Sequence, residues 1–391
     1  MILRKIYLEK NQDIIYLKAD CVIEGCAETL WYATSIENEK YISLTNADAF
    51  ILVLFIYSIF NNKRLKSEVP ISTRLKYGLL EILLPTFQMM GYKSIKEDFD
   101  FALEDDSIFP EAKAVGTAMS FGVDSFHAYL DSQNTQYPVD TLTLFNAGAF
   151  GQHGGVEAKR LFELMKSKVK NFAKKEGKKF LWVDTNLNEK LKMEFVQTHA
   201  YRNFSCTLMF QNLFSKYYYA SGLTIDSFKL TDTDTAYYDL LISKAIGSNC
   251  LEFIISGLTI NRMQKTKIIA ESSITFDELN VCIIVPDNKN LNKNNITTNC
   301  SKCFKCIRTM TYLDVIGELE KYRNVFDLNI YKKKKDRYLG NLLYMKYRAN
   351  NVFSKELFEE ARKRNYKLNK KIYYYALIRV FQPIFKRLKS N

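Results

Sequence analysis

The chain has 391 residues, of which 47% are hydrophobic and 25% are charged. This composition excludes a disordered chain and supplies apolar material for about two or three folded domains. The net charge of +13 leaves binding to nucleic acid or to an acidic membrane surface open. A lysine-rich, AT-biased coding sequence gives the same excess, so nucleic-acid binding is not favoured.

The hydrophobic runs and the cysteines indicate the compartment. The longest apolar run, residues 49–60, is 12 residues long, whereas a bilayer span needs about 20. The N-terminus has no signal-peptide core. We therefore expect a cytoplasmic protein without a transmembrane segment, with its eight cysteines as thiols rather than disulfides. Four scattered cysteines are expected to be small core residues: Cys21, Cys26, Cys206 and Cys250.

Residues 1–112 carry no catalytic pattern and predict an accessory α+β domain. A helix that begins at Thr73 is expected to end before Pro85, because proline disrupts a helix interior. The expected elements are strands at 5–8, 14–17 and 30–34, helices at 48–60 and 73–84, and an acidic surface connection at 96–106.

From residue 113 apolar strand runs alternate with helical patterns. This order predicts an α/β domain over 113–310, with a parallel sheet covered by helices on both faces. Ligands bind such sheets beyond the carboxyl ends of the strands, so the polar residues that follow each strand are expected around one crevice. The expected strands are 114–119, 141–145, 180–183, 217–220 and 251–255, and the expected helices are 156–174, 191–214, 235–246 and 261–271.

The stretch from Ser120 to Ser125 combines a strand end, a Ser/Gly loop and a helix start. Backbone N–H groups at a helix N-terminus face an anion there, and hydroxyl groups add further donors. Gly122 lets a ligand approach the backbone closely. Asp124 can hold a metal ion or orient an amide. The stretch therefore predicts a phosphate site, while His127 just beyond it is expected to pack on the helix.

A second loop, residues 146–155, also lies between a strand and a helix. It lacks the G-x-G-x-x-G spacing of a dinucleotide site, so we favour a loop that lines the same nucleotide crevice, through Asn146 and Gly148. Asp184 and Asn186 follow the next strand and are candidates for the same edge. His199 lies in a predicted helix, where a structural histidine is favoured over a substrate contact.

Four cysteines are grouped near residue 300. Cys282 and the C-x2-C-x2-C run of Cys300, Cys303 and Cys306 supply four thiolates, enough for a closed, structural zinc site. An iron–sulfur cluster stays open. Unligated core cysteines fit poorly with the Lys and Ser residues between them.

The end of the chain, residues 311–391, predicts a helical region that follows an Asn- and Lys-rich connection at 285–299. Its last segment, 371–389, is basic, aromatic and helical. We favour a docking helix there, although a helix on an anionic membrane surface stays open.

The loop sequence Ser120-Phe121-Gly122-Val123-Asp124-Ser125 resembles the S-G-G-x-D-S signature of the PP-loop ATP pyrophosphatases. Together with the four cysteines, residues 113–310 are similar to the 7-cyano-7-deazaguanine synthase branch of queuosine biosynthesis. Residues 303–310 also resemble a group of uncharacterised synthase-like proteins, whose Gly/Arg/Lys tip is matched by Gly257, Arg262 and Lys265. Phe121 departs from the first glycine of the signature, as in phosphoadenylylsulfate reductases and their relatives, which often read S-F-G.

The resemblance implies an adenine nucleotide alpha hydrolase-like fold and an AMP-forming ligase or synthase. ATP would be cleaved to AMP and pyrophosphate with Mg²⁺ while Zn²⁺ holds the four cysteines. A carboxylate or carbonyl of a small metabolite, sugar or peptide would be activated for nitrogen transfer of the type that forms an amide or a nitrile. The implied catalytic residues are Asp124 and Ser125. The implied ATP-binding residues are Ser120, Phe121, Gly122, Val123, Asp124, Ser125, Asn146 and Gly148. The candidate substrate residues are Asp184, Asn186, His199, Arg262 and Lys265.

Two other functions stay open at this point. A PP-loop enzyme that modifies tRNA would account for the basic charge. A non-catalytic nucleotide-binding module of a biosynthetic or defence system would account for Phe121. A homodimer stays open as well.

Overall fold

The computed structural model describes residues 1–282, 299–349 and 351–389, which form two compact units. The first unit holds residues 1–120 and 128–259, and the second holds residues 121–127 and 260–391. Helix α4 (Val123–Ser132) begins in the second unit and ends in the first. The domain limits at 112 and 310 stay predictions. The predicted connection at 285–299 lies outside the described residues up to residue 298.

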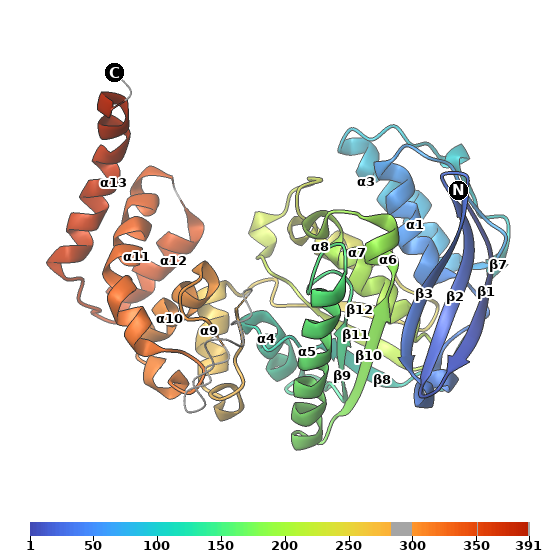
Figure 1. The fold of residues 1–391 in the computed structure, drawn as a ribbon, viewed down its shortest axis with the longest axis horizontal. Coiled ribbons are helices and arrows are strands. Elements are labelled where there is room, and N and C mark those ends of the chain that lie inside the picture. Colours follow the sequence, from blue (N-terminus) through green and yellow to red (C-terminus); the bar gives the residue numbers. More distant parts are fainter. Residues whose placement is uncertain (283–298, 350, 390–391) are drawn as a thin grey trace. The chain divides into compact units, whose positions relative to one another are not determined.

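Five parallel strands form one half of the main sheet in the first unit (Figure 1). All five residues of β9 are buried, so both faces of that strand are covered, as its continuous apolar sequence predicts. The chain runs from β8 outward through β9 and β10 and then returns to the opposite side of β8 at β11. The strand order therefore reverses beside β8, which is where ligands bind in sheets of this kind. In spatial order the strands are β12 (Glu252–Ser256), β11 (Phe214–Ala220), β8 (Ala114–Ala118), β9 (Thr141–Phe145) and β10 (Lys179–Thr185).

The N-terminal strands continue the same sheet instead of forming a separate one. β3 pairs antiparallel with β10, with Ala33 opposite Asp184 and Tyr32 opposite Thr185. Most neighbouring strands of the resulting ten-stranded sheet are parallel, so the predicted α/β class with a mostly parallel sheet is confirmed. Beyond β3 the order is β2 (Ile14–Ile23), β1 (Ile2–Asn11), β4 (Leu65–Ser67) and β6 (Phe99–Asp100), while β5 (Ile71–Ser72) and β7 (Glu104–Asp105) pair separately.

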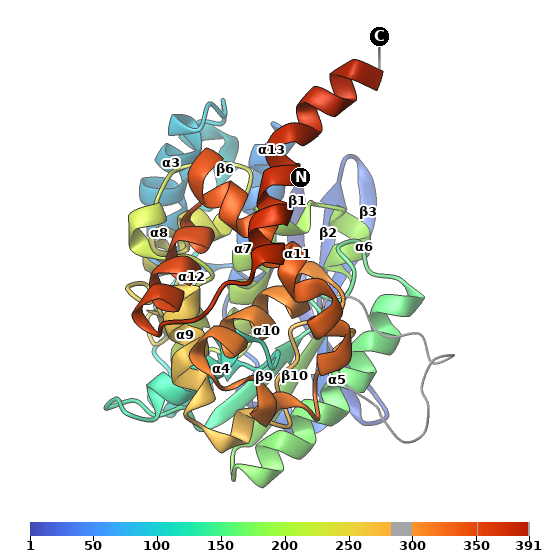
Figure 2. The same ribbon diagram turned by 90° about the vertical axis from the view of Figure 1, so that its left-hand side faces the viewer.

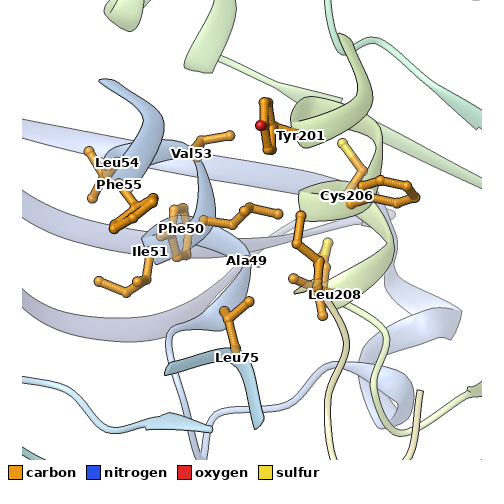
Figure 3. Close-up of a cluster of buried hydrophobic side chains, with 14 of the residues drawn as sticks. Ala49, Phe50, Ile51, Val53, Leu54, Phe55, Leu75, Tyr201, Cys206 and Leu208 are labelled. Carbon is orange, nitrogen blue, oxygen red and sulfur yellow. The ribbon is translucent and has the colours of Figure 1, made fainter. Parts of the chain in front are cut away.

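The core of the first unit lies around helix α1 (Asp48–Phe60), which is apolar on almost every side and is accordingly buried. It packs against α7 (Phe195–Leu208), and Figure 3 shows side chains of α1, such as Phe50, in one buried cluster with Tyr201, Cys206 and Leu208 of α7. The Phe50 ring lies 4.9 Å from the ring of Tyr32 in β3. Residues of the N-terminal segment thus share one core with those of the parallel half.

Three predicted helices have wrong boundaries. The predicted helix at 235–246 is a short 3-10 helix (Thr235–Tyr237) followed by α8 (Asp239–Ala245). The helix at Thr73 does not end before Pro85: α2 (Thr73–Tyr77) passes through a π-helical turn (Gly78–Leu83) into α3 (Leu84–Met89), with Pro85 in the first turn of α3. The missing N–H of proline is tolerated at such a position. The predicted helix at 191–214 is instead α6 (Leu187–Leu191), a left-handed residue at Lys192, and α7.

Asp48 gives the first unit a predicted pH dependence. Its buried carboxylate accepts hydrogen bonds from the N–H (2.8 Å) and Oγ (2.5 Å) of Ser72, yet burial raises its pKa from 3.8 to about 7. The folded state therefore binds this proton more tightly than the unfolded chain. Its stabilising contribution is complete below about pH 4 and is lost as the pH rises to about 7.

Between pH 5 and pH 8, loss of this proton should lower the free energy of unfolding of the natural protein by on the order of a few kcal/mol. We expect Asp48→Asn, which cannot titrate, to lack this decrease. Urea denaturation of both proteins at the two pH values measures this. Equal pH slopes in the two proteins would contradict the raised pKa of Asp48.

The second unit is helical in its described residues, as predicted for the C-terminal region (Figure 2). Helix α13 packs on α11 at Gly340, where an added Cβ would lie 2.6 Å from the Cβ of Tyr375. Glycine is needed at this close approach. The helices of this unit are α9 (Arg262–Ala270), α10 (Phe304–Ile316), α11 (Leu328–Arg348), α12 (Val352–Lys363) and α13 (Lys370–Lys389).

Candidate active site and cysteine cluster

The chain leaves β8 through Met119 and Ser120 and turns into α4 at Val123. The Met119 N–H donates to the carbonyl of Thr143 (2.9 Å), which ties the strand end to β9. At the other side of the turn, the N–H of Phe126 and the Oγ of Ser125 both donate to the carbonyl of Gly122 (3.0 and 3.1 Å). The strand–loop–helix arrangement predicted for residues 114–130 is therefore present, with β8 at Ala114–Ala118 and α4 at Val123–Ser132.

Phe121 has an unusual backbone conformation for its size. Its φ is +60°, in the left-handed region, although its side chain is fully buried and packs edge-on against Phe126, with ring centroids 5.9 Å apart. Its carbonyl accepts a hydrogen bond from the N–H of Asn280 (2.8 Å). A bulky residue pays a conformational cost at positive φ, so burial of the ring holds this turn in place. The sequence predicted Phe121 as a substituted motif position and an ATP-binding residue, but gave no sign of its buried ring or its left-handed backbone.

Phe121 should therefore respond unusually to truncation. Phe121→Ala is expected to lower the free energy of unfolding by about 3–5 kcal/mol, because it loses the buried ring and keeps a left-handed Cβ. Phe121→Gly should be the more stable of the two by about 1 kcal/mol, since glycine relieves the strain. Urea denaturation of both variants tests the order. An alanine variant as stable as the glycine variant would argue against backbone strain.

Asp124 lies in the first turn of α4 and pairs with two cations from α9. Its Oδ2 lies 2.8 Å from Arg262 Nη2, and its Oδ1 lies 3.5 Å from Lys265 Nζ. The two cations are three residues apart, so they occupy one face of α9, whose first turn is fixed by an Asn261 capping box. The side chain of Lys265 is only 2% exposed. Three predicted site residues are thus brought together within the second unit.

Helix α10 adds charged and polar groups that the sequence reasoning missed. Lys305, Arg308 and Tyr312 lie on one face of α10, which packs against α9. Burial lowers the pKa of both Lys305 and Arg308, and the nearby Arg262 lowers each further. Burial also raises the pKa of Tyr312. The i, i+3, i+7 spacing of Lys305, Arg308 and Tyr312, which places them on one face of the helix, was the signal that could have found them.

Asn146 and Asp184, both predicted, meet in the first unit. Asn146 Nδ2 donates to Asp184 Oδ1 (2.7 Å). Burial raises the pKa of Asp184, while this hydrogen bond and the N–H of Thr185 oppose the rise. The pair therefore forms a partly buried polar contact at the ends of β9 and β10.

Gly148 has a structural reason to be glycine. Its φ is +105°, and an added Cβ would lie 2.5 Å from Arg202 Nη1. The buried Arg202 donates to the Gln152 carbonyl (3.1 Å) and to Asn188 Oδ1 (3.0 Å). The predicted glycine-rich loop therefore encloses a buried guanidinium, whose pKa burial lowers to about 10.

Asn186 and His199 make well-defined contacts within the first unit. Asn186 bridges to β3: its Oδ1 accepts from the Trp31 N–H (2.8 Å) and its Nδ2 donates to the Thr29 carbonyl (2.9 Å). His199 lies 2.9 Å from Tyr219 Oη and 3.1 Å from Asp234 Oδ1. Burial opposes ionisation of Asp234, but the His199 contact and the Ala236 N–H lower its pKa overall. Both contacts fit structural roles.

The four predicted cysteines form one cluster in the second unit. The sulfur atoms of Cys282, Cys300, Cys303 and Cys306 all lie within 4.8 Å of one another, so the group could hold a metal ion such as zinc. Cys303 is the N-cap residue of α10 and its Sγ lies 3.4 Å from that of Cys306. The contact with Cys282 and then burial raise the pKa of the Cys306 thiol, because neighbouring thiolates repel one another. A divalent cation would supply the missing positive charge.

Fold and cluster together define an α/β protein with a cysteine group suited to a metal. None of the helices in the described ranges combines the length and apolar content needed to cross a bilayer. Comparison with family models, curated proteins and solved structures gives no match.

Proposed function

We propose that this protein is an ATP-dependent, AMP-forming enzyme of the PP-loop ATP pyrophosphatase class. The observation that carries the proposal is the loop from Ser120 to Ser125. It follows β8 at the point where the strand order reverses, opens a helix, and carries an aspartate beside Arg262 and Lys265. The N-terminus of a helix with cations beside its first turn is suited to phosphate groups.

In this proposal the phosphates of ATP bind the loop at Ser120, Gly122 and Ser125. An oxygen of the acceptor carboxylate attacks the α-phosphorus, the bond to the β-phosphate oxygen breaks, and pyrophosphate leaves. A nitrogen nucleophile then attacks the acyl carbon, the carbon–oxygen bond to AMP breaks, and the nitrogen loses a proton to solvent. The first step needs charge stabilisation and alignment more than a protein nucleophile.

The charged residues around the loop suit these demands. Arg262 and Lys265 would stabilise the negative charge that moves onto the departing pyrophosphate. The carboxylate of Asp124, which is partly exposed, would hold Mg²⁺, an ion that prefers oxygen ligands and substrate phosphates. The four cysteines are suited to Zn²⁺ with no open position, which is a structural role.

The test is to incubate the protein with ATP, Mg²⁺, ammonium and a panel of carboxylic acids, and to measure the nucleotide products. We expect AMP and pyrophosphate in the presence of the correct acid. Formation of ADP and phosphate would overturn the proposal. ATP binding without turnover across the whole panel would favour a non-catalytic nucleotide-binding module.

A tRNA-modifying enzyme of the same class is the second candidate, and charge distribution favours it. Residues 328–391 contain 18 Lys and Arg but only four Asp and Glu, a net charge of +14, so the preceding 327 residues carry −1. Filter binding of tRNA across a salt series is the test, because phosphate contacts give a steep salt dependence. Weak binding of tRNA, with an affinity that does not change with salt concentration, would exclude this candidate.

A further inference from the structure

Helices α10 and α11 carry a cluster of four polar residues: Lys305, Arg308, Tyr312 and Tyr338. Among the described residues, neither the exposed Lys305 nor the half-buried Arg308 forms an ion pair with a carboxylate. The hydroxyl oxygens of Tyr312 and Tyr338 are buried and have no hydrogen-bond partner in the described chain. Tyr312 is 1% exposed as a whole residue. Buried polar groups are nearly always satisfied, so each exception calls for an explanation.

Aromatic rings hold these groups in place without neutralising them. The Arg308 guanidinium lies over the Phe304 ring (5.2 Å to the centroid) and the Phe353 ring (5.5 Å). The Phe304 ring in turn packs edge-on against Tyr338, with centroids 6.3 Å apart. Stacking orients a guanidinium but leaves its N–H donors free for an anion.

The balance of charge at the cluster is positive. Four cations lie on the neighbouring helices α9 and α10: Arg262, Lys265, Lys305 and Arg308. Asp124 pairs with the two on α9 and also interacts with Lys305 and Arg308, while Glu356 on α12 is the other carboxylate that interacts with this group among the described residues, through Tyr312. Apart from the cysteine cluster, whose Cys303 interacts with Lys305, two positive charges remain, together with two hydroxyl donors.

We propose that Lys305, Arg308, Tyr312 and Tyr338 form a binding site for an oxyanion, a carboxylate or a phosphate group, of a small acidic molecule. Lys305 and Arg308 supply the charge, and the two hydroxyl groups donate hydrogen bonds. That this molecule is the acceptor substrate rests on the proposed function, whereas the anion site itself does not. The acceptor is then an acid with a second anionic group besides the carboxylate that is activated.

Calorimetric titration of the full, metal-loaded chain with inorganic phosphate or succinate, without ATP and at constant ionic strength, tests the site. The two ligands distinguish a phosphate site from a carboxylate site. We expect saturable binding of at least one, weakened at least about tenfold by Arg308→Gln. Arg323→Gln, an exposed arginine of the same unit, is the matched control and should leave the affinity unchanged. Absence of binding, or equal affinity in Arg308→Gln, overturns the proposal.

Tyr312→Phe separates binding from folding. It removes only a hydroxyl without a described partner, so its Tm should equal or exceed that of the natural protein while its anion affinity falls several-fold. Loss of Tm without loss of affinity would contradict the role of Tyr312. If Ser125→Ala weakens the anion as much as Arg308→Gln, the anion binds the loop and the separate site is wrong. Anion binding without AMP formation would overturn the proposed function alone.

Discussion

Asp124→Ala is expected to abolish formation of AMP and pyrophosphate, with a loss of at least about 100-fold in kcat. The substitution removes both the proposed Mg²⁺ ligand and the carboxylate that pairs with Arg262 and Lys265. Asp124→Asn should be nearly as inactive, because the amide has almost the same shape but neither charge nor metal affinity. Rates should be measured well below the Tm of each variant, since both lose two ion pairs.

Glu320→Gln is the matched control for this charge change, because Glu320 is an exposed acid of the same unit. It should retain full activity. If Asp124→Asn forms AMP at the rate of the natural protein, Asp124 has no role in catalysis.

Metal removal is expected to have the largest effect on stability. Four thiolates within 4.8 Å repel one another unless a cation binds them, so a strong chelator should lower the Tm by more than about 10 °C. Elemental analysis should find one zinc ion per chain. Cys303→Ser should lose both the metal and most of this stability.

Cys26→Ser provides the comparison, since Cys26 is exposed, so its predicted core position was wrong, and it lies outside the cluster. It should keep the metal and the Tm. Iron with visible absorbance in place of zinc would instead identify the alternative iron–sulfur cluster, and a metal-free protein with unchanged Tm would refute a structural metal.

Local signals in the sequence predicted the parallel half of the sheet well. β9 and α5 (Val156–Lys175) were predicted to within a residue, because a buried strand is a short apolar run and an amphipathic helix repeats every 3.6 residues. The four cysteines were also predicted as a group, since their spacing is itself the signal. Their sulfur atoms meet in the fold as expected.

The features that were missed depend on contacts between distant residues. Pairing of β3 with β10 joins residues about 150 positions apart, and periodicity does not report which strands become neighbours. The left-handed φ of Phe121 depends on burial of its ring, so the residue type alone suggested an ordinary conformation. Lys305 and Arg308 were overlooked because a cation on a helix is most often solvated, and only the packing of α10 on α9 gathers them.

The pairing of β3 with β10 also affects how the protein can be divided for experiments. A fragment that begins near residue 113 would lack β3 and would leave the backbone N–H and C=O groups of Asp184 and Thr185 unpaired along an open edge. It would also uncover the side of α7 that packs on α1. Open edges of buried sheets associate with other chains, so such a fragment should precipitate on expression. The N-terminal strands thus act as a permanent edge cover, and they should be kept in any recombinant fragment that carries β8.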